Sequence, residues 1–145
     1  MVMRMRCLLL VIAAALTSSA GLALAQDAPP VPEAARDAVT NYITTMEIEE
    51  GGVSLIDEQT GETRHLAFEE LLGPSGAAGL PSVCVRMSDE ATGERVDVDF
   101  ELEPTADGLE VAELYIHQVG GRPRYTYDAE GRRVPSAEAP QPATP

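Results

Sequence analysis

The chain has 145 residues with 24 acidic and 10 basic side chains, which gives a formal net charge of −14 at pH 7. Nucleic-acid binding needs a basic surface that displaces counterions, so this charge excludes a nucleic-acid partner. It also excludes a polybasic membrane-surface protein. The length suits one domain, and two cysteines are too few for a disulfide-rich scaffold.

The first 25 residues have the pattern of a secretory signal peptide. Two arginines precede a short apolar run over residues 7–16, and Ala23-Leu24-Ala25 gives the small-x-small pattern that signal peptidase cuts, before Gln26. The apolar run is too short for a comfortable transmembrane helix. We therefore expect a periplasmic or secreted protein, cleaved near Ala25-Gln26, with no stable membrane insertion afterwards.

The rest of the chain divides into a leader, one domain and a tail. Residues 26–31 form a polar, proline-rich leader, and residues 135–145 form a Pro/Ala-rich tail without apolar periodicity, so both are expected to be disordered. Residues 32–134 form the domain. Its first element is a helix over Pro32–Met46, because apolar residues recur there at three- and four-residue steps and Gly51-Gly52 stops the pattern.

After this helix the apolar period changes to two, which predicts strands. The turn sequence D-E-x-T-G-E occurs at residues 57–62 and again at residues 89–94, and its aspartate and glycine suit hairpin loops. Phe68–Leu72 (FEELL) is expected to form a helical turn that ends at Gly73. The expected strands are 53–56, 63–68, 83–88, 95–102, 109–119 and 122–127.

The hairpin turns fix which residues of neighbouring strands face each other. The second D-E-x-T-G-E turn places Arg86 opposite Asp97, and Cys84 opposite Asp99. In the strand 96–103 the acidic residues alternate with apolar ones, so we expect a half-buried strand whose acidic face is solvated. The Gly120-Gly121 turn continues the strand 109–119 into 122–127, with Ile116 opposite Tyr125, Leu114 opposite Tyr127, and His117 opposite Arg124.

These elements predict an α+β fold in which one N-terminal helix packs on an antiparallel meander of about six short strands. The order of elements resembles the cystatin-like and NTF2-like α+β folds, which implies a curved sheet that wraps a helix. The stretch Ile116–Asp128 (IHQVGGRPRYTYD) is also similar to small exported bacterial proteins that end in an IH-x-V-x-G-x-x-R-Y hairpin. That similarity implies only that the protein is exported.

No motif in the sequence specifies catalysis, a metal or a cofactor. Cys84 has no C-x-x-C partner and is expected to be an inert thiol. The two histidines, His65 and His117, have no neighbouring nucleophile. We therefore predict no cofactor and no metal site, and we take the face opposite the helix as the candidate binding face. Its members are Arg86, Asp97, Tyr115, His117 and Arg124.

Three functions fit these observations. The first is a small exported, non-catalytic binding or interaction module of the bacterial envelope, whose partner is an envelope protein or a small ligand. The second is an NTF2-like small-ligand pocket or enzyme that uses Tyr115, His117 and Arg124. The third is divalent-cation binding by the acidic strand 97–103, since hard cations prefer carboxylate oxygens. We favour the first, because catalytic constellations are missing from the sequence.

Overall fold

The computed structural model describes residues 30–76 and 81–137. The predicted signal peptide and the last eight residues of the predicted tail lie outside these ranges. No helix in the described ranges is long and apolar enough to cross a membrane. The elements are α1 (Glu33–Glu50), β1 (Val53–Ile56), β2 (Thr63–Pro74), β3 (Ser82–Asp89), β4 (Arg95–Thr105), β5 (Gly108–Val119), β6 (Arg122–Pro123), β7 (Tyr125–Tyr127) and β8 (Arg133–Pro135).

The helix α1 packs one apolar stripe on the sheet. Ala35, Val39 and Ile43 recur at four-residue steps and are buried, which is the spacing of one helical face. The helix runs to Glu50, one turn beyond the predicted end at Met46. It stops at Gly51, whose φ of 81° is left-handed and whose N–H donates to the carbonyl of Glu47. The predicted glycine stop is therefore confirmed.

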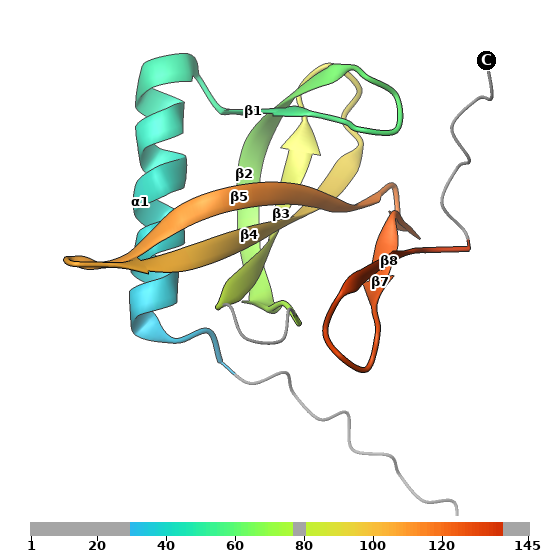
Figure 1. Ribbon diagram of the computed structural model, residues 1–145. Helices are drawn as coiled ribbons and strands as arrows, with labels where there is room; N and C mark the ends of the chain where they lie inside the picture. Colours follow the sequence, from blue (N-terminus) through green and yellow to red (C-terminus); the bar gives the residue numbers. More distant parts are fainter. Residues whose placement is uncertain (1–29, 77–80, 138–145) are drawn as a thin grey trace, which may run out of the picture.

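Strands β1 to β6 form one antiparallel sheet in chain order, so the predicted α+β fold of a helix on a six-stranded meander is confirmed (Figure 1). The predicted pairing of β3 with β4 is also confirmed, because Arg86 lies opposite Asp97 and Cys84 lies opposite Asp99. The apolar residues that alternate with these four face α1 and form the core. They include Val83, Val85, Met87, Val96, Val98, Phe100 and Leu102.

The two D-E-x-T-G-E turns have the same geometry. In each turn the aspartate carboxylate accepts a hydrogen bond from the backbone N–H two residues later, at 3.1 Å for Asp57 and 2.9 Å for Asp89. The glycine adopts a left-handed φ of 74° or 73°. The guanidinium of Arg64 donates to both aspartates, at 3.0 and 2.8 Å. A single cation therefore joins two hairpin turns that are distant in sequence.

The predicted helical turn at Phe68–Leu72 is wrong, because these residues continue β2 as far as Pro74. Phe68 pairs with Met87 and Leu71 pairs with Val85, and irregularities in the register lie between and after these pairs. Pairing with β3 satisfies the backbone groups and packs Leu71 against the core. These tertiary contacts outweigh the local helical preference of the sequence.

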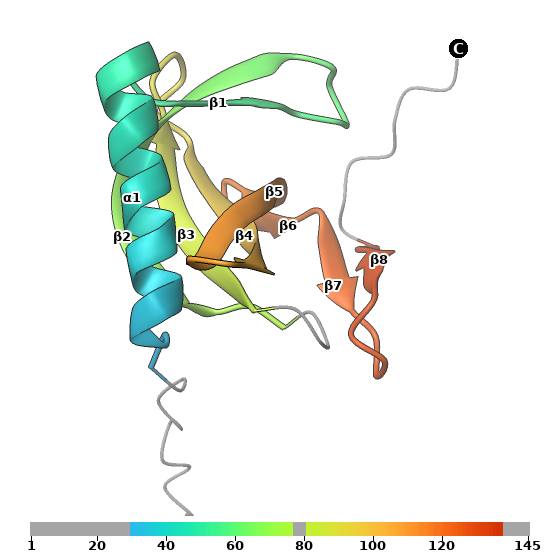
Figure 2. The same ribbon diagram turned by 60° about the vertical axis from the view of Figure 1, so that its left-hand side comes forward.

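The predicted final strand over 122–127 is also wrong. The chain leaves the six-stranded sheet after Pro123, and Tyr125 pairs with Pro135 in a separate two-stranded sheet of β7 and β8. The backbone N–H of Arg124 still donates to the carbonyl of His117 at 2.7 Å, so the chain separates from β5 beyond this bond. The hairpin and the helix lie on opposite sides of the six-stranded sheet (Figure 2). Pro135, which we placed in the disordered tail, is the last residue of β8.

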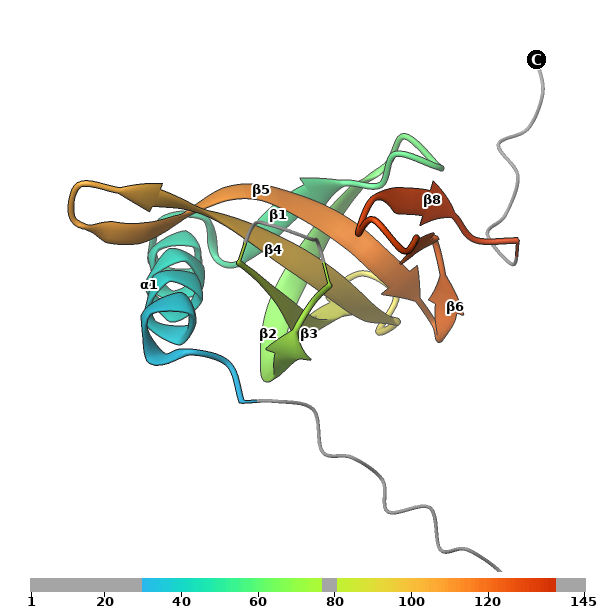
Figure 3. The ribbon, with the colours of Figure 1, turned by 60° about the horizontal axis from the view of Figure 1, so that its bottom comes forward.

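The chain segment that carries β8 lies at the other side of the sheet from α1 (Figure 3). We use the term outer face for the side of β3, β4 and β5 that points away from α1. The predicted solvated acidic face of β4 is wrong for two of its four acids, because Asp97 is 4% exposed and Asp99 is 0% exposed. The C-terminal hairpin supplies two of the side chains that contact Asp99.

Candidate functional site

A buried carboxylate lies at the centre of the outer face. The Oδ2 atom of Asp99 accepts three hydrogen bonds: from His117 Nδ1 at 3.0 Å, from the Tyr125 hydroxyl at 2.8 Å and from the Tyr127 hydroxyl at 2.9 Å. The two tyrosine rings meet edge to face, with centroids 5.6 Å apart. Asp99 therefore connects β5 and the β7–β8 hairpin to the middle of the sheet.

An irregularity in β5 directs His117 toward this carboxylate. Asp97 pairs with Gln118 while Val98 pairs with Ile116, so His117 is an extra residue in the ladder. Such a bulge redirects a side chain. As a result, His117 reaches Asp99 while its neighbour Gln118 donates to Asp97 at 2.6 Å.

The hydrogen bonds of this cluster shift the pKa values of the groups that make them. Burial alone would raise the pKa of Asp99, but the bonds from His117 and from the two tyrosines outweigh it and hold the pKa below its ordinary value. The bond to Asp99 raises the pKa of His117. Burial, with the Asp99 charge, raises the pKa of Tyr125 and of Tyr127, so both hydroxyls remain protonated donors. The second oxygen of Asp99, Oδ1, is buried and has no hydrogen-bond partner among the described residues.

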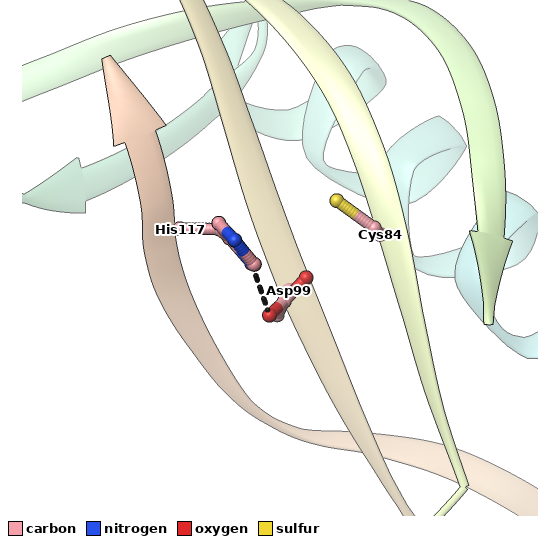
Figure 4. Close-up of side chains that lie close together, drawn as sticks. All are labelled: Cys84, Asp99 and His117. Atoms are coloured by element: carbon pink, nitrogen blue, oxygen red, sulfur yellow. Dashed lines mark hydrogen bonds and ion pairs between the residues drawn. The ribbon is translucent and has the colours of Figure 1, made fainter. Parts of the chain in front are cut away.

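Cys84 lies on the neighbouring strand β3, on the other side of Asp99 from His117 (Figure 4). One donor atom from each of Cys84, Asp99 and His117 lies within 4.8 Å of the other two. Burial, followed by the nearby Asp99 charge, raises the pKa of the thiol. A nucleophilic cysteine needs a lowered pKa and a base beside it, and the imidazole of His117 is bonded to Asp99. This geometry does not make a cysteine nucleophile.

The structure divides the predicted binding face into separate contacts. Arg86 donates to Asp97 at 3.2 Å and to Glu70 at 2.6 Å. His117 belongs to the Asp99 cluster. Arg124 turns away from both to the first hairpin turn, where it donates to Asp57 at 2.9 Å.

The remaining acids of the strand 97–103 do not form a row of free carboxylates. Glu101 lies 3.8 Å from a guanidinium nitrogen of Arg133. Arg133 also lies over the ring of Tyr115, with its guanidinium carbon 3.1 Å from the ring centroid. Arg133 therefore pairs with the protein's own strands β4 and β5.

A cavity of about 780 Å³ lies between β1, β5 and the β7–β8 hairpin. Its apolar lining comes from β1, β5 and β8, with Leu55, Ile116 and Val134 as examples, and its charged lining consists of two acids and two arginines. We call this cavity the groove. It is lined by Ser54, Leu55, Ile56, Asp57, Glu58, Gln59, Leu114, Tyr115, Ile116, Arg124, Tyr125, Arg133, Val134 and Pro135.

Two of the five predicted face residues, Tyr115 and Arg124, line the groove. Sequence reasoning missed the contributions of Tyr125 and Arg133, because both depend on the hairpin turning back over the outer face. The tyrosine-rich YTY segment followed by arginines was the available signal, since buried tyrosines need hydroxyl partners.

Comparison of the chain with protein-family models, with curated proteins and with solved structures finds no significant match. What the protein binds is therefore inferred from the groove and from the side chains around it.

Proposed function

We propose that the protein is an exported, non-catalytic binding module of the bacterial envelope, and that it binds a small amphipathic ligand or an apolar segment of an envelope protein in the groove. The observation that carries this proposal is the groove itself. Ligand sites are concave and mainly apolar, with a few polar groups that fix orientation. The volume of about 780 Å³ is in the range of such sites.

The lining indicates the chemistry of the ligand. Ile56 is 61% exposed and Val134 is 36% exposed at the rim, and both line the groove. An apolar body placed there would cover them and gain free energy from their burial. Two acids and two arginines also line the groove, so their formal charges cancel. This balance favours a ligand with little net charge and one polar group.

A binding role is favoured over a catalytic one because the polar side chains of the candidate site already bond to other residues of the protein. Arg124 is engaged by Asp57 and Gln59, while His117 is engaged by Asp99. A small-ligand enzyme that used Tyr115, His117 and Arg124 together would need their functional groups to converge on one substrate. In the structure each of these groups has partners of its own: Arg124 donates to Asp57 and Gln59, His117 bonds to Asp99, and the hydroxyl of Tyr115 donates to Glu113.

An uncharged fluorescent probe with an apolar ring system and one polar group, N-phenyl-1-naphthylamine, tests the groove. We expect Ile56→Ser to weaken probe binding about fivefold, because removing about 1 kcal/mol of apolar burial has that effect. The matched control is Ile48→Ser, since Ile48 is 79% exposed on α1 and does not line the groove. Equal affinity in the wild type and both variants, or an equal loss in both variants, would overturn the proposal.

A further inference from the structure

We propose that Cys84, Asp99 and His117 form a binding site for a divalent transition-metal ion of the zinc class. This site is distinct from the groove and does not depend on the function proposed for it. Three neighbouring strands, β3, β4 and β5, each contribute one donor to the same spot on the outer face (Figure 4). The donors are a thiol sulfur, a carboxylate oxygen and an imidazole nitrogen, which are the three donor types that zinc uses in proteins.

The spacing of the donors is close to that of a tetrahedral site. With metal–ligand bonds of about 2.0–2.3 Å, two ligands of a tetrahedral ion lie about 3.5 Å apart. The donors of Cys84, Asp99 and His117 lie within 4.8 Å of one another. Small side-chain rotations that move the donor atoms by about 1 Å would bring them to the metal, since the strands already hold the backbones in register. Three protein ligands leave a fourth position for water or an exogenous ligand.

The unpartnered oxygen of Asp99 points to a missing ligand. Asp99 is 0% exposed, and its Oδ1 atom has no hydrogen-bond partner in the described part of the chain. A buried carboxylate oxygen without a partner costs free energy, and a metal ion would supply that partner. The site is also accessible, because the side chain of His117 is 29% exposed.

The other oxygen of Asp99 already has the surroundings of a ligating carboxylate. Its bonds from the hydroxyls of Tyr125 and Tyr127, at 2.8 and 2.9 Å, hold the side chain in place. Carboxylates that bind metals are oriented by such outer hydrogen bonds. When the ion binds through Oδ1, these two bonds remain.

The charges of the loaded site balance. A divalent ion displaces the proton of the Cys84 thiol to solvent. His117 binds as the neutral imidazole, so an imidazolium at this position also releases one proton to solvent when the ion binds. One thiolate, one carboxylate and one divalent ion then have no net charge, which suits a partly buried site.

Cobalt(II) alone is the probe for the test, because it replaces zinc and reports a thiolate ligand by a charge-transfer absorption band. The full-length protein, freshly reduced, is titrated with Co²⁺. We expect one equivalent to produce the band and Zn²⁺ to displace it. Cys84→Ser abolishes the band, while Cys7→Ser, the change at the other cysteine, which only the chain that keeps residues 1–25 contains, leaves it intact.

The histidine and tyrosine variants test the other donors. His117→Ala weakens Co²⁺ binding by more than tenfold, whereas His65→Ala, at the other histidine on β2, does not. Tyr127→Phe, which removes only an outer hydrogen bond, weakens it by about 10–100-fold. Thermal unfolding of each variant verifies that it is folded. No band in the wild type, a band that survives Cys84→Ser, or equal losses in His117→Ala and His65→Ala would each overturn the proposal.

Discussion

The hydroxyl of Tyr125 provides the sharpest test of how the C-terminal hairpin is held on the sheet. It donates to the buried carboxylate of Asp99 at 2.8 Å. Tyr125→Phe removes this donor and keeps the ring that packs edge to face on Tyr127. A hydrogen bond to a charged group contributes about 1.5–3 kcal/mol. We therefore expect the free energy of unfolding to fall by about 2 kcal/mol, which lowers Tm by about 8–16 °C for a domain of this size.

The control for this change is Tyr42→Phe. The Tyr42 ring lies edge-on against Phe100, with centroids 6.0 Å apart, and its hydroxyl makes no side-chain hydrogen bond in the described residues. A change that removes no such contact alters stability by less than about 0.5 kcal/mol. Urea unfolding followed by circular dichroism gives both values. If Tyr125→Phe and Tyr42→Phe unfold with the same free energy, the bond to Asp99 does not hold the hairpin.

Three further predictions concern the hairpin turns and the N-terminus. Arg64→Ala leaves two buried turn aspartates without their shared cation. We therefore expect the free energy of unfolding, measured in urea, to fall by about 3–5 kcal/mol. The control Arg36→Ala, on the exposed side of α1, should lower it by less than about 0.5 kcal/mol. Burial alone would raise the pKa of Asp89, but hydrogen bonds from backbone N–H groups and from Arg64 lower it. The stability that this aspartate contributes is therefore present above its unfolded pKa of about 3.9 and is lost as the pH falls below it. Asp89→Asn should reduce the drop in stability between about pH 5 and about pH 2.5, and an unchanged drop would contradict this. Expression in a bacterial host and N-terminal sequencing of the exported protein should give Gln26 as the first residue, whereas a retained Met1 would contradict export by this route.

Local sequence patterns predicted the helix and the central hairpins, because each depends on neighbours in the chain. The alternation over residues 96–103 fixed which side chains of β4 face α1, and the turn at residues 89–94 fixed its register with β3. Arg86 and Cys84 therefore lie opposite Asp97 and Asp99, as predicted.

The candidate site could not be predicted in this way, because it depends on contacts between distant segments. The strand pattern predicted that Asp99 faces solvent, and the C-terminal hairpin buries it. His117 reaches Asp99 through a bulge in β5, and no residue type in that strand predicts this bulge. No residue type marks where the last strand leaves the sheet, because Pro123 pairs with Gln118 within the ladder and Arg124 still donates to His117 beyond it.

The central claim is that the groove between β1, β5 and the β7–β8 hairpin binds a ligand. Nuclear magnetic resonance of isoleucine, leucine and valine methyl groups, recorded while uncharged N-phenyl-1-naphthylamine is added, tests it most directly. We predict that the largest shifts fall on methyl groups of Ile56, Leu114 and Val134, which line the groove, and that Ile48 on α1 does not shift. Shifts spread evenly over the surface, or concentrated on Ile48, would contradict the claim.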